Sequence, residues 1–363
     1  MHLIVDAHQD LAYNIVSFGR DYLRSVAETR QIEKNSDVIA HNGTTLLGWP
    51  EYQRGRVGII FSTLFVPPNY KMLPSWETNV YHDFAEANRL YRDQIDIYHR
   101  LADEHPEKIT LLRTTYDLDL HLVKWQNPVD GYEPPVGLVI LMEGAEGIRT
   151  PDELEMWWSL GLRIIGLAWT GTRYCGGTFA PGPLTSAGRE LLAAMADFNF
   201  TLDISHMDAE AALQALDFYP GPVIAGHANA AALLPNANSN RHLTDDVLHG
   251  IIAHDGVIGV VPFNRFLKAD WQMGDPREQV TLELLIAHID YICQIAGDAR
   301  HVGFGSDFDG GFGMEMVPAE IDTIADLQKL VPLLAARGYT DKDIAAIFGQ
   351  NFIDHLKRNL PSL

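Results

Sequence analysis

The chain has 363 residues, 47% of them hydrophobic, which is enough apolar material for a large core. Its 27 Lys and Arg and 48 Asp and Glu give a formal net charge of −21, which argues against nucleic acid and against an anionic membrane as partners. Its two cysteines, Cys175 and Cys293, exclude a disulfide scaffold and a cysteine-rich zinc site. Without a signal-peptide core or a membrane-spanning apolar run, the composition predicts a cytoplasmic protein.

Eight short apolar runs rich in β-branched residues are predicted to be strands. They cover residues 3–8, 57–66, 136–143, 162–169, 200–206, 222–227, 256–263 and 301–307. The runs are continuous rather than alternating, which is typical of parallel strands covered on both faces.

Helical patterns lie between these runs. The spacing of apolar residues predicts helices over 78–102, 186–198, 245–254, 281–296 and 341–356. Thr185 or Ser186 is the expected N-cap of the second, Thr244 that of the third, and Gly297 stops the fourth. The alternation predicts a (β/α)8 barrel formed by a single domain over residues 1–363. A doubly wound open sheet is the alternative, because strand order cannot be read from a sequence.

Titratable side chains stand at or just past the ends of five predicted strands. They are His8 and Asp10, then Glu143, His206, His227 and Asp307. His8 and Asp10 are two residues apart, so in an extended chain they point to the same side. In a barrel all these strand ends surround one mouth, which is where active sites are built.

Five of these side chains offer the nitrogen and oxygen donors that suit zinc or a similar divalent ion: His8, Asp10, Glu143, His206 and His227. Five ligands are too many for one tetrahedral site with an open position, so they predict two ions about 3.5–4 Å apart with a bridging carboxylate. Glu143 is the predicted bridge, since no lysine stands at a strand end to replace it after modification. Taken singly, each His could be a hydrogen-bonded structural residue, and Glu143 could cap a helix or pair with Arg149.

Several motifs resemble the membrane (renal) dipeptidase family, zinc-dependent peptidases on an amidohydrolase-type barrel. The matching segments are VDAHQD (5–10), LMEGAEGI (141–148), DISHMD (203–208), VIAGHANA (223–230), NRHLTDDVL (240–248), HVGFGSDFDGG (301–311) and IFGQNFIDHL (347–356). They span nearly the whole chain and look like those of a soluble bacterial-type member.

The resemblance implies a binuclear zinc-dependent dipeptidase. His8 and Asp10 would hold the first zinc and His206 and His227 the second, with Glu143 as the bridge. A metal-bridging hydroxide would attack the peptide carbonyl of a short dipeptide, including dipeptides with a D-residue at the C-terminal position.

Other residues receive roles from the same resemblance. Asp307 would take the proton and pass it to the leaving amine. Arg241 would bind the C-terminal carboxylate of the substrate, a bidentate task that suits a guanidinium. Trp169 and Asn264 are the further substrate-binding residues. Trp169 departs from the best-known members, which carry a His there, and an indole can donate a hydrogen bond but cannot titrate near neutrality.

Two alternatives stay open at this point. Trp169 and the segment TGTRYCGGTFAPGP (170–183) would also suit another amidohydrolase, such as an N-acyl amino acid deacylase. A non-catalytic metal-binding barrel is the third hypothesis. Nitrogen and oxygen ligands do not decide between zinc, manganese, iron and cobalt. A homodimer is expected only from the general frequency of such assemblies.

Overall fold

The computed structural model describes residues 1–69, 73–126, 131–237 and 239–362. Its strands are β1 (Ile4–Gln9), β2 (Val57–Leu64), β3 (Ile109–Leu111), β4 (Val136–Glu143), β5 (Leu162–Gly166), β6 (Cys175–Gly177), β7 (Ala180–Leu184), β8 (Thr201–Asp203), β9 (Val223–Ile224), β10 (Ile258–Val260) and β11 (Val302–Phe304). Its α-helices are α1 (Leu11–Phe18), α2 (Val26–Glu33), α3 (Val38–Asn42), α4 (Trp49–Gly55), α5 (Phe84–Glu104), α6 (Thr115–Gln126), α7 (Leu154–Ser159), α8 (Ser186–Phe198), α9 (Ala209–Phe218), α10 (Asp245–Ala253), α11 (Asn264–Leu267), α12 (Leu282–Ala296), α13 (Leu330–Ala336), α14 (Asp341–Ala345) and α15 (Asn351–Asn359).

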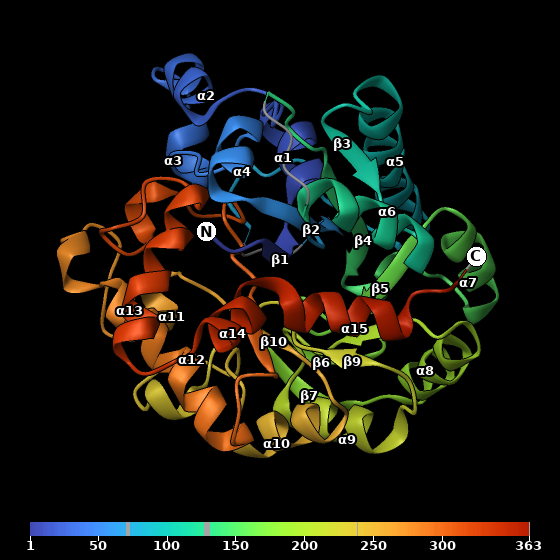
Figure 1. Ribbon diagram of the computed structural model, residues 1–363. Coiled ribbons are helices and arrows are strands. Elements are labelled where there is room, and N and C mark those ends of the chain that lie inside the picture. Colours follow the sequence, from blue (N-terminus) through green and yellow to red (C-terminus); the bar gives the residue numbers. More distant parts are fainter. Residues whose placement is uncertain (70–72, 127–130, 238, 363) are drawn as a thin grey trace.

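Eight parallel strands form a ring with helices around it (Figure 1). Their order is β10-β11-β1-β2-β4-β5-β8-β9, and a parallel bridge from Ala225, just after β9, to Ile258 of β10 completes the circle. These strands are the eight apolar runs of the sequence, so the predicted (β/α)8 barrel is confirmed and the open sheet is excluded. The expectation of a single domain over the whole chain stays a prediction.

The strands converge closely where the ring closes. A Cβ atom on Gly305, which follows β11, would lie 1.8 Å from the carbonyl oxygen of Gly226, which follows β9. No side chain fits in that space, so glycine at position 305 lets the strand ends beside His227 approach one another.

The barrel interior holds its own apolar cluster. Alternate residues of the strands point inwards, for example Val139 and Leu141 of β4. Phe352 of α15 belongs to the same cluster, and its ring lies 5.3 Å from that of Phe61 of β2 in a T-shaped contact. The last helix therefore covers the end of the barrel where the strands begin (Figure 1), and a cavity lies at the opposite end, where the strands finish.

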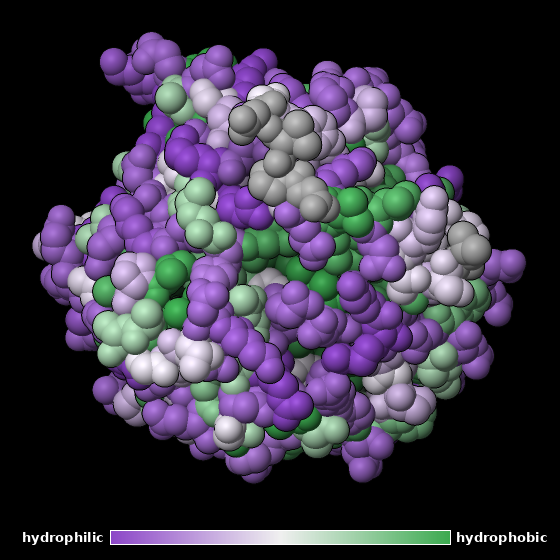
Figure 2. Space-filling model, in the orientation of Figure 1, coloured by the Kyte–Doolittle hydropathy of each residue, from purple (hydrophilic) through white to green (hydrophobic). Residues whose placement is uncertain are grey.

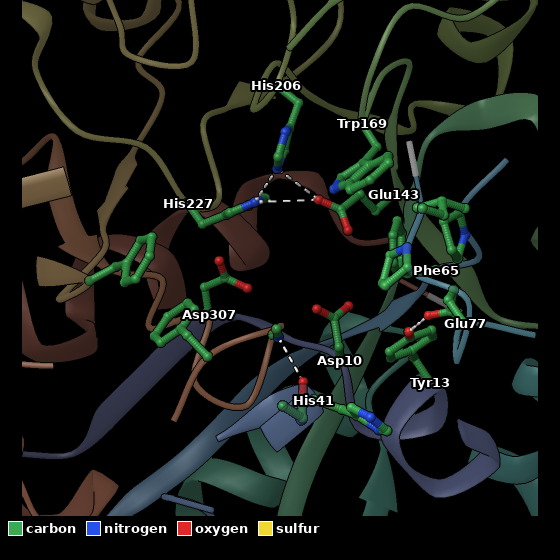
Figure 3. Close-up of a pocket in the computed structure, with 18 of the residues that line it drawn as sticks. Asp10, Tyr13, His41, Phe65, Glu77, Glu143, Trp169, His206, His227 and Asp307 are labelled. Atoms are coloured by element: carbon green, nitrogen blue, oxygen red, sulfur yellow. Dashed lines mark hydrogen bonds and ion pairs between the residues drawn. The ribbon is translucent and has the colours of Figure 1, made fainter. Parts of the chain in front are cut away.

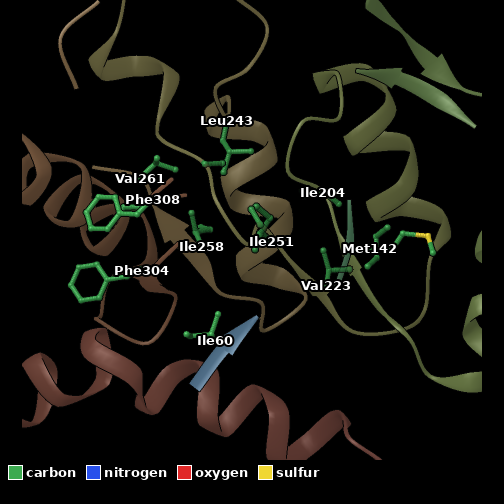
Figure 4. Close-up of a cluster of buried hydrophobic side chains, with 14 of the residues drawn as sticks. Ile60, Met142, Ile204, Val223, Leu243, Ile251, Ile258, Val261, Phe304 and Phe308 are labelled. Atoms are coloured by element: carbon green, nitrogen blue, oxygen red, sulfur yellow. The ribbon is translucent and has the colours of Figure 1, made fainter. Parts of the chain in front are cut away.

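A second apolar cluster joins the outer faces of the strands to the helices. Figure 4 shows part of it, with Ile258 and Phe304 from the strands and Ile251 from α10. All three side chains are fully buried, and burying each contributes roughly 1.5–3 kcal/mol. The two layers fix the strand ends that carry the polar residues.

The predicted helix boundaries need correction in two places. The helix expected over 78–102 begins at Phe84, because the side chain of Asp83 accepts a hydrogen bond from the Glu86 backbone N–H and caps it there. The helix expected over 341–356 is interrupted by a π-helical segment, Ala346–Gln350, and continues to Asn359. The short strand β3 and the β6–β7 hairpin were not predicted.

The face seen in Figure 2 is mainly hydrophilic, with smaller hydrophobic areas near its middle, in keeping with the charge of −21. Within the described residues, every helix is too short or too polar to cross a membrane.

Candidate active site

The titratable residues that follow the strands meet at the open mouth of the barrel (Figure 3). Glu143 is the last residue of β4, and Asp10 directly follows β1. His206, His227 and Asp307 each stand three residues beyond the end of their strand. The pairing of β1 with β2 shifts register between Asp6 and Gln9, around His8. Such irregularities re-aim side chains beside active sites.

Glu143 lies at the centre of the group. Its Oε1 is 3.1 Å from Nε2 of His206 and 3.3 Å from Nε2 of His227. Its Oε2 is 3.7 Å from Nε2 of His8, which is in turn 3.7 Å from Oδ1 of Asp10. The two oxygens of one carboxylate therefore face two separate sets of donors, and Glu143 does not pair with Arg149, which instead pairs with Glu153.

Unusual backbone conformations orient two of these side chains. His206 has φ 64 and Asp307 has φ 54, both in the left-handed region that non-glycine residues rarely adopt. Asp307 Oδ1 lies 3.9 Å from His8 Nε2, and the Asp307 backbone N–H donates to the His8 carbonyl at 3.2 Å. Such strain persists only where the surrounding structure holds it, and it is concentrated at functional sites.

Burial and crowded carboxylates dominate the electrostatics. Burial lowers the pKa of His8, but Glu143, Asp10 and Asp307 outweigh it and raise that pKa to about 10. Burial raises the pKa of Glu143 well above its ordinary value and that of Asp307 to about 7. Buried carboxylates this close together require positive charge between them.

The donor set fits divalent cations. One group of ligand atoms, from His8, Glu143 and His227, lies within 4.8 Å of one another, and so does a second group from His8, Asp10 and Asp307. Both ring nitrogens of His8 are buried, and neither has a hydrogen-bond partner among the described residues. Burial lowers the pKa of His227 well below its ordinary value, so the ring is neutral and its lone pair is available. Imidazoles and carboxylates at such spacings are ligands suited to zinc.

Several residues that support the site were not predicted from the sequence. The Thr63 hydroxyl donates a hydrogen bond to Oδ1 of Asp10. The Thr178 hydroxyl lies 3.0 Å from Nδ1 of His206, and the Tyr91 hydroxyl donates to the Glu143 carbonyl at 2.8 Å. Partners of this kind orient ligands in metal sites. Their sequence neighbourhoods carry no pattern that distinguishes them from other Thr and Tyr residues.

Two of the three predicted substrate-binding residues line the active-site cavity, and the third does not. Arg241 and Trp169 both line the cavity of about 340 Å³ that opens onto the donor cluster. Arg241 donates to the His227 carbonyl at 2.6 Å, while its Nε and Nη1 have no partner among the described residues. Asn264 is fully buried and is not among the described residues that line this cavity, although its neighbours Phe263 and Phe266 are. Its substrate-binding role stays a prediction.

A parallel barrel whose open mouth gathers buried histidines and carboxylates defines a metal-dependent hydrolase of the α/β barrel class. The comparisons with known proteins agree. The family model described as membrane dipeptidase, peptidase family M19, matches residues 1–358. An uncharacterised dipeptidase of Schizosaccharomyces pombe is 28% identical over 361 residues, which cover 96% of this chain and 79% of that protein.

Solved structures have the same fold. The metallopeptidase called dipeptidase AC is 24% identical with a TM-score of 0.78, covering 99% of both chains. A metallopeptidase of Rhodobacter sphaeroides, solved with a phosphinate mimic of the dipeptide L-Ala-D-Ala, is 23% identical with the same TM-score and coverage. The chain belongs to the membrane dipeptidase family, peptidase family M19, and is a metallo-dipeptidase. The resemblance seen in the sequence is thereby confirmed.

Proposed function

We propose that this protein is a binuclear, zinc-dependent dipeptidase that cleaves short dipeptides with a free C-terminal carboxylate. The observation that carries the proposal is the position of Glu143, whose Oε1 faces His206 and His227 while its Oε2 faces His8. One carboxylate placed between two donor sets is suited to holding two cations close together.

The ligands divide into two sets around Glu143. His8 and Asp10 would hold one ion, and His206 and His227 the other. When bound, the ions would polarise the scissile carbonyl. They would also lower the pKa of a bound water, so that it could lose a proton near neutral pH.

Asp307 is the proposed proton carrier. Its carboxylate lines the cavity beside the ligand His8 and is largely screened from solvent, with 15% of the side chain exposed. It would accept a proton from the attacking water and return it to the leaving nitrogen. We expect Asp307→Asn to lower kcat by roughly 10²–10⁴-fold, the range typical of a lost general acid–base group.

Arg241 is the proposed anchor for the C-terminal carboxylate of the substrate. It is buried, and two of its nitrogens remain available for donation. A buried guanidinium gives a strong charge-assisted hydrogen bond to a carboxylate, so dipeptides should be preferred over dipeptide amides. Trp169 would contribute to substrate binding by donating a hydrogen bond from its indole or by packing against the substrate.

The test is hydrolysis of a panel of dipeptides by zinc-loaded protein, with L- and D-residues at the second position because the Rhodobacter relative was solved with a mimic of L-Ala-D-Ala. We expect turnover that is lost on chelation and restored by zinc. N-acyl amino acids are the comparison substrates: faster cleavage of these would favour a deacylase, and no cleavage of any dipeptide would contradict the proposal.

A further inference from the structure

A fourth carboxylate, Glu77, lines the active-site cavity together with Asp10, Glu143 and Asp307. It lies in the segment between β2 and α5, apart from the strand ends that supply the proposed ligands. In the described part of the chain, no Lys or Arg side chain lies within ion-pair distance of it. A cavity carboxylate with no proposed metal role and no cationic partner among the described residues is a candidate for substrate recognition.

Glu77 is held in place by hydrogen bonds. The Tyr13 hydroxyl donates to its Oε2, and the Asn79 backbone N–H donates to its Oε1 at 2.9 Å. The Asn79 side chain donates to the Ser17 hydroxyl at 3.2 Å, which ties this segment to α1. Burial and the bond to Glu77 raise the pKa of Tyr13, so the phenol keeps its proton and remains a donor.

A wall of aromatic rings connects the proposed metal centre to Glu77 (Figure 3). The ring centroid of Trp169 is 6.5 Å from that of His206 and 5.1 Å from that of Phe65. Phe65 lies 5.4 Å from Tyr13, whose hydroxyl reaches Glu77. Aromatic faces attract cations as well as apolar side-chain stems, and the carboxylate at the end of the wall supplies an opposite charge.

The length of this wall distinguishes two positive groups that a dipeptide could offer. The α-ammonium nitrogen is only two bonds from the scissile carbonyl carbon and must stay beside the metal centre. A lysine or arginine side chain extends much further and follows the rings towards Glu77. The carboxylate is therefore better placed for the side chain than for the α-ammonium group.

Building on the proposed function, we propose that Glu77 makes this enzyme select dipeptides whose first residue has a positively charged side chain. Arg241 and Glu77 would then place opposite charges at the two sides of the cavity and fix the direction in which the substrate lies. The overall charge of −21 would add a general attraction for cationic substrates.

The test compares kcat/KM for Lys-Ala and Met-Ala, whose first side chains have similar length but differ in charge. We expect the zinc-loaded wild type to prefer Lys-Ala by roughly tenfold to a hundredfold, as for a charge-assisted hydrogen bond. Glu77→Gln should lower this ratio by about tenfold or more. Glu155→Gln removes the same charge from an exposed position on α7 and should keep the ratio, which separates a local contact from the general field.

A second variant keeps the test decisive. Glu77→Lys should reverse the preference, so that Glu-Ala becomes a better substrate than Lys-Ala. An unchanged ratio in Glu77→Gln, or an equal loss on both substrates, would overturn the inference while leaving the dipeptidase proposal intact. If the wild type cleaves neither substrate nor any other dipeptide of the panel, the proposed function itself fails.

Discussion

Replacing Asp309 by asparagine should destabilise the protein strongly, because this fully buried carboxylate has four polar partners. Its Oδ2 accepts hydrogen bonds from the Thr45 hydroxyl at 2.6 Å and the Tyr22 hydroxyl at 3.1 Å, and it pairs with Arg20 at 2.9 Å. Its Oδ1 accepts from the Leu46 backbone N–H at 2.9 Å. An asparagine removes the charge and turns one of the two acceptors into a donor that faces other donors.

The size of the stability loss depends on which partners Arg20 keeps when Asp309 is replaced. Breaking a buried ion pair by removing one partner costs about 3–5 kcal/mol. Arg20 keeps its 2.9 Å bond to Glu33, so we expect the lower end, about 3 kcal/mol. The entropy of unfolding for a chain of this size is about 0.8 kcal/mol/K, which converts the loss into a fall in Tm of roughly 4 °C.

Scanning calorimetry at pH 7 measures this change. The matched control is Asp322→Asn, which removes a carboxylate that is 65% exposed and pairs with Arg30 at 2.9 Å. An exposed pair contributes at most about 1 kcal/mol, so the control should shift Tm by about 1 °C or less. Equal shifts in the two variants would refute the reasoning that the Asp309 network is a buried, mutually dependent set of charges.

Three further predictions concern the site and the pH dependence of stability. Gly310→Ala should lower kcat by about tenfold or more, because a Cβ there would lie 2.0 Å from Oδ1 of Asp307 and 2.9 Å from the Asp307 carbonyl oxygen. Full activity would contradict this. Arg241→Lys should raise KM for dipeptides but hardly affect dipeptide amides, and equal effects on both would remove Arg241 as the carboxylate anchor. Burial lowers the pKa of His121 to about 4, so the folded protein favours the neutral ring. The free energy of unfolding should therefore fall by roughly 3 kcal/mol as the pH falls from about 6.5 to about 4. His121→Gln should therefore flatten the fall of Tm over this range, whereas an unchanged slope would show that another group is responsible.

The barrel could be predicted because its strands are continuous apolar runs, and the proposed ligands because each stands at or just past the end of such a run. The prediction that Glu143 is the bridge rests on its place at the end of a strand and on the absence of a lysine at any predicted strand end. The two helix corrections have local causes: the cap at Asp83 competes with the apolar periodicity, and the π-helical turn leaves no mark in that periodicity.

Other features depend on contacts between distant parts of the chain. Tyr13 and Glu77 are 64 positions apart, and Thr63 meets Asp10 across 53 positions. No single-sequence pattern links such residues, because their meeting depends on how loops cross the mouth of the finished barrel. The sequence could therefore predict the proposed metal ligands but neither the residues that orient them nor Glu77.

The most direct test of the proposed centre is the number of metal ions that the protein retains. Purified protein is loaded with zinc, dialysed against metal-free buffer and measured by atomic emission alongside Glu143→Gln. If Glu143 joins two donor sets, the wild type should hold about two ions per chain and the variant fewer. One ion or none in the wild type, or an unchanged number in the variant, would contradict the account.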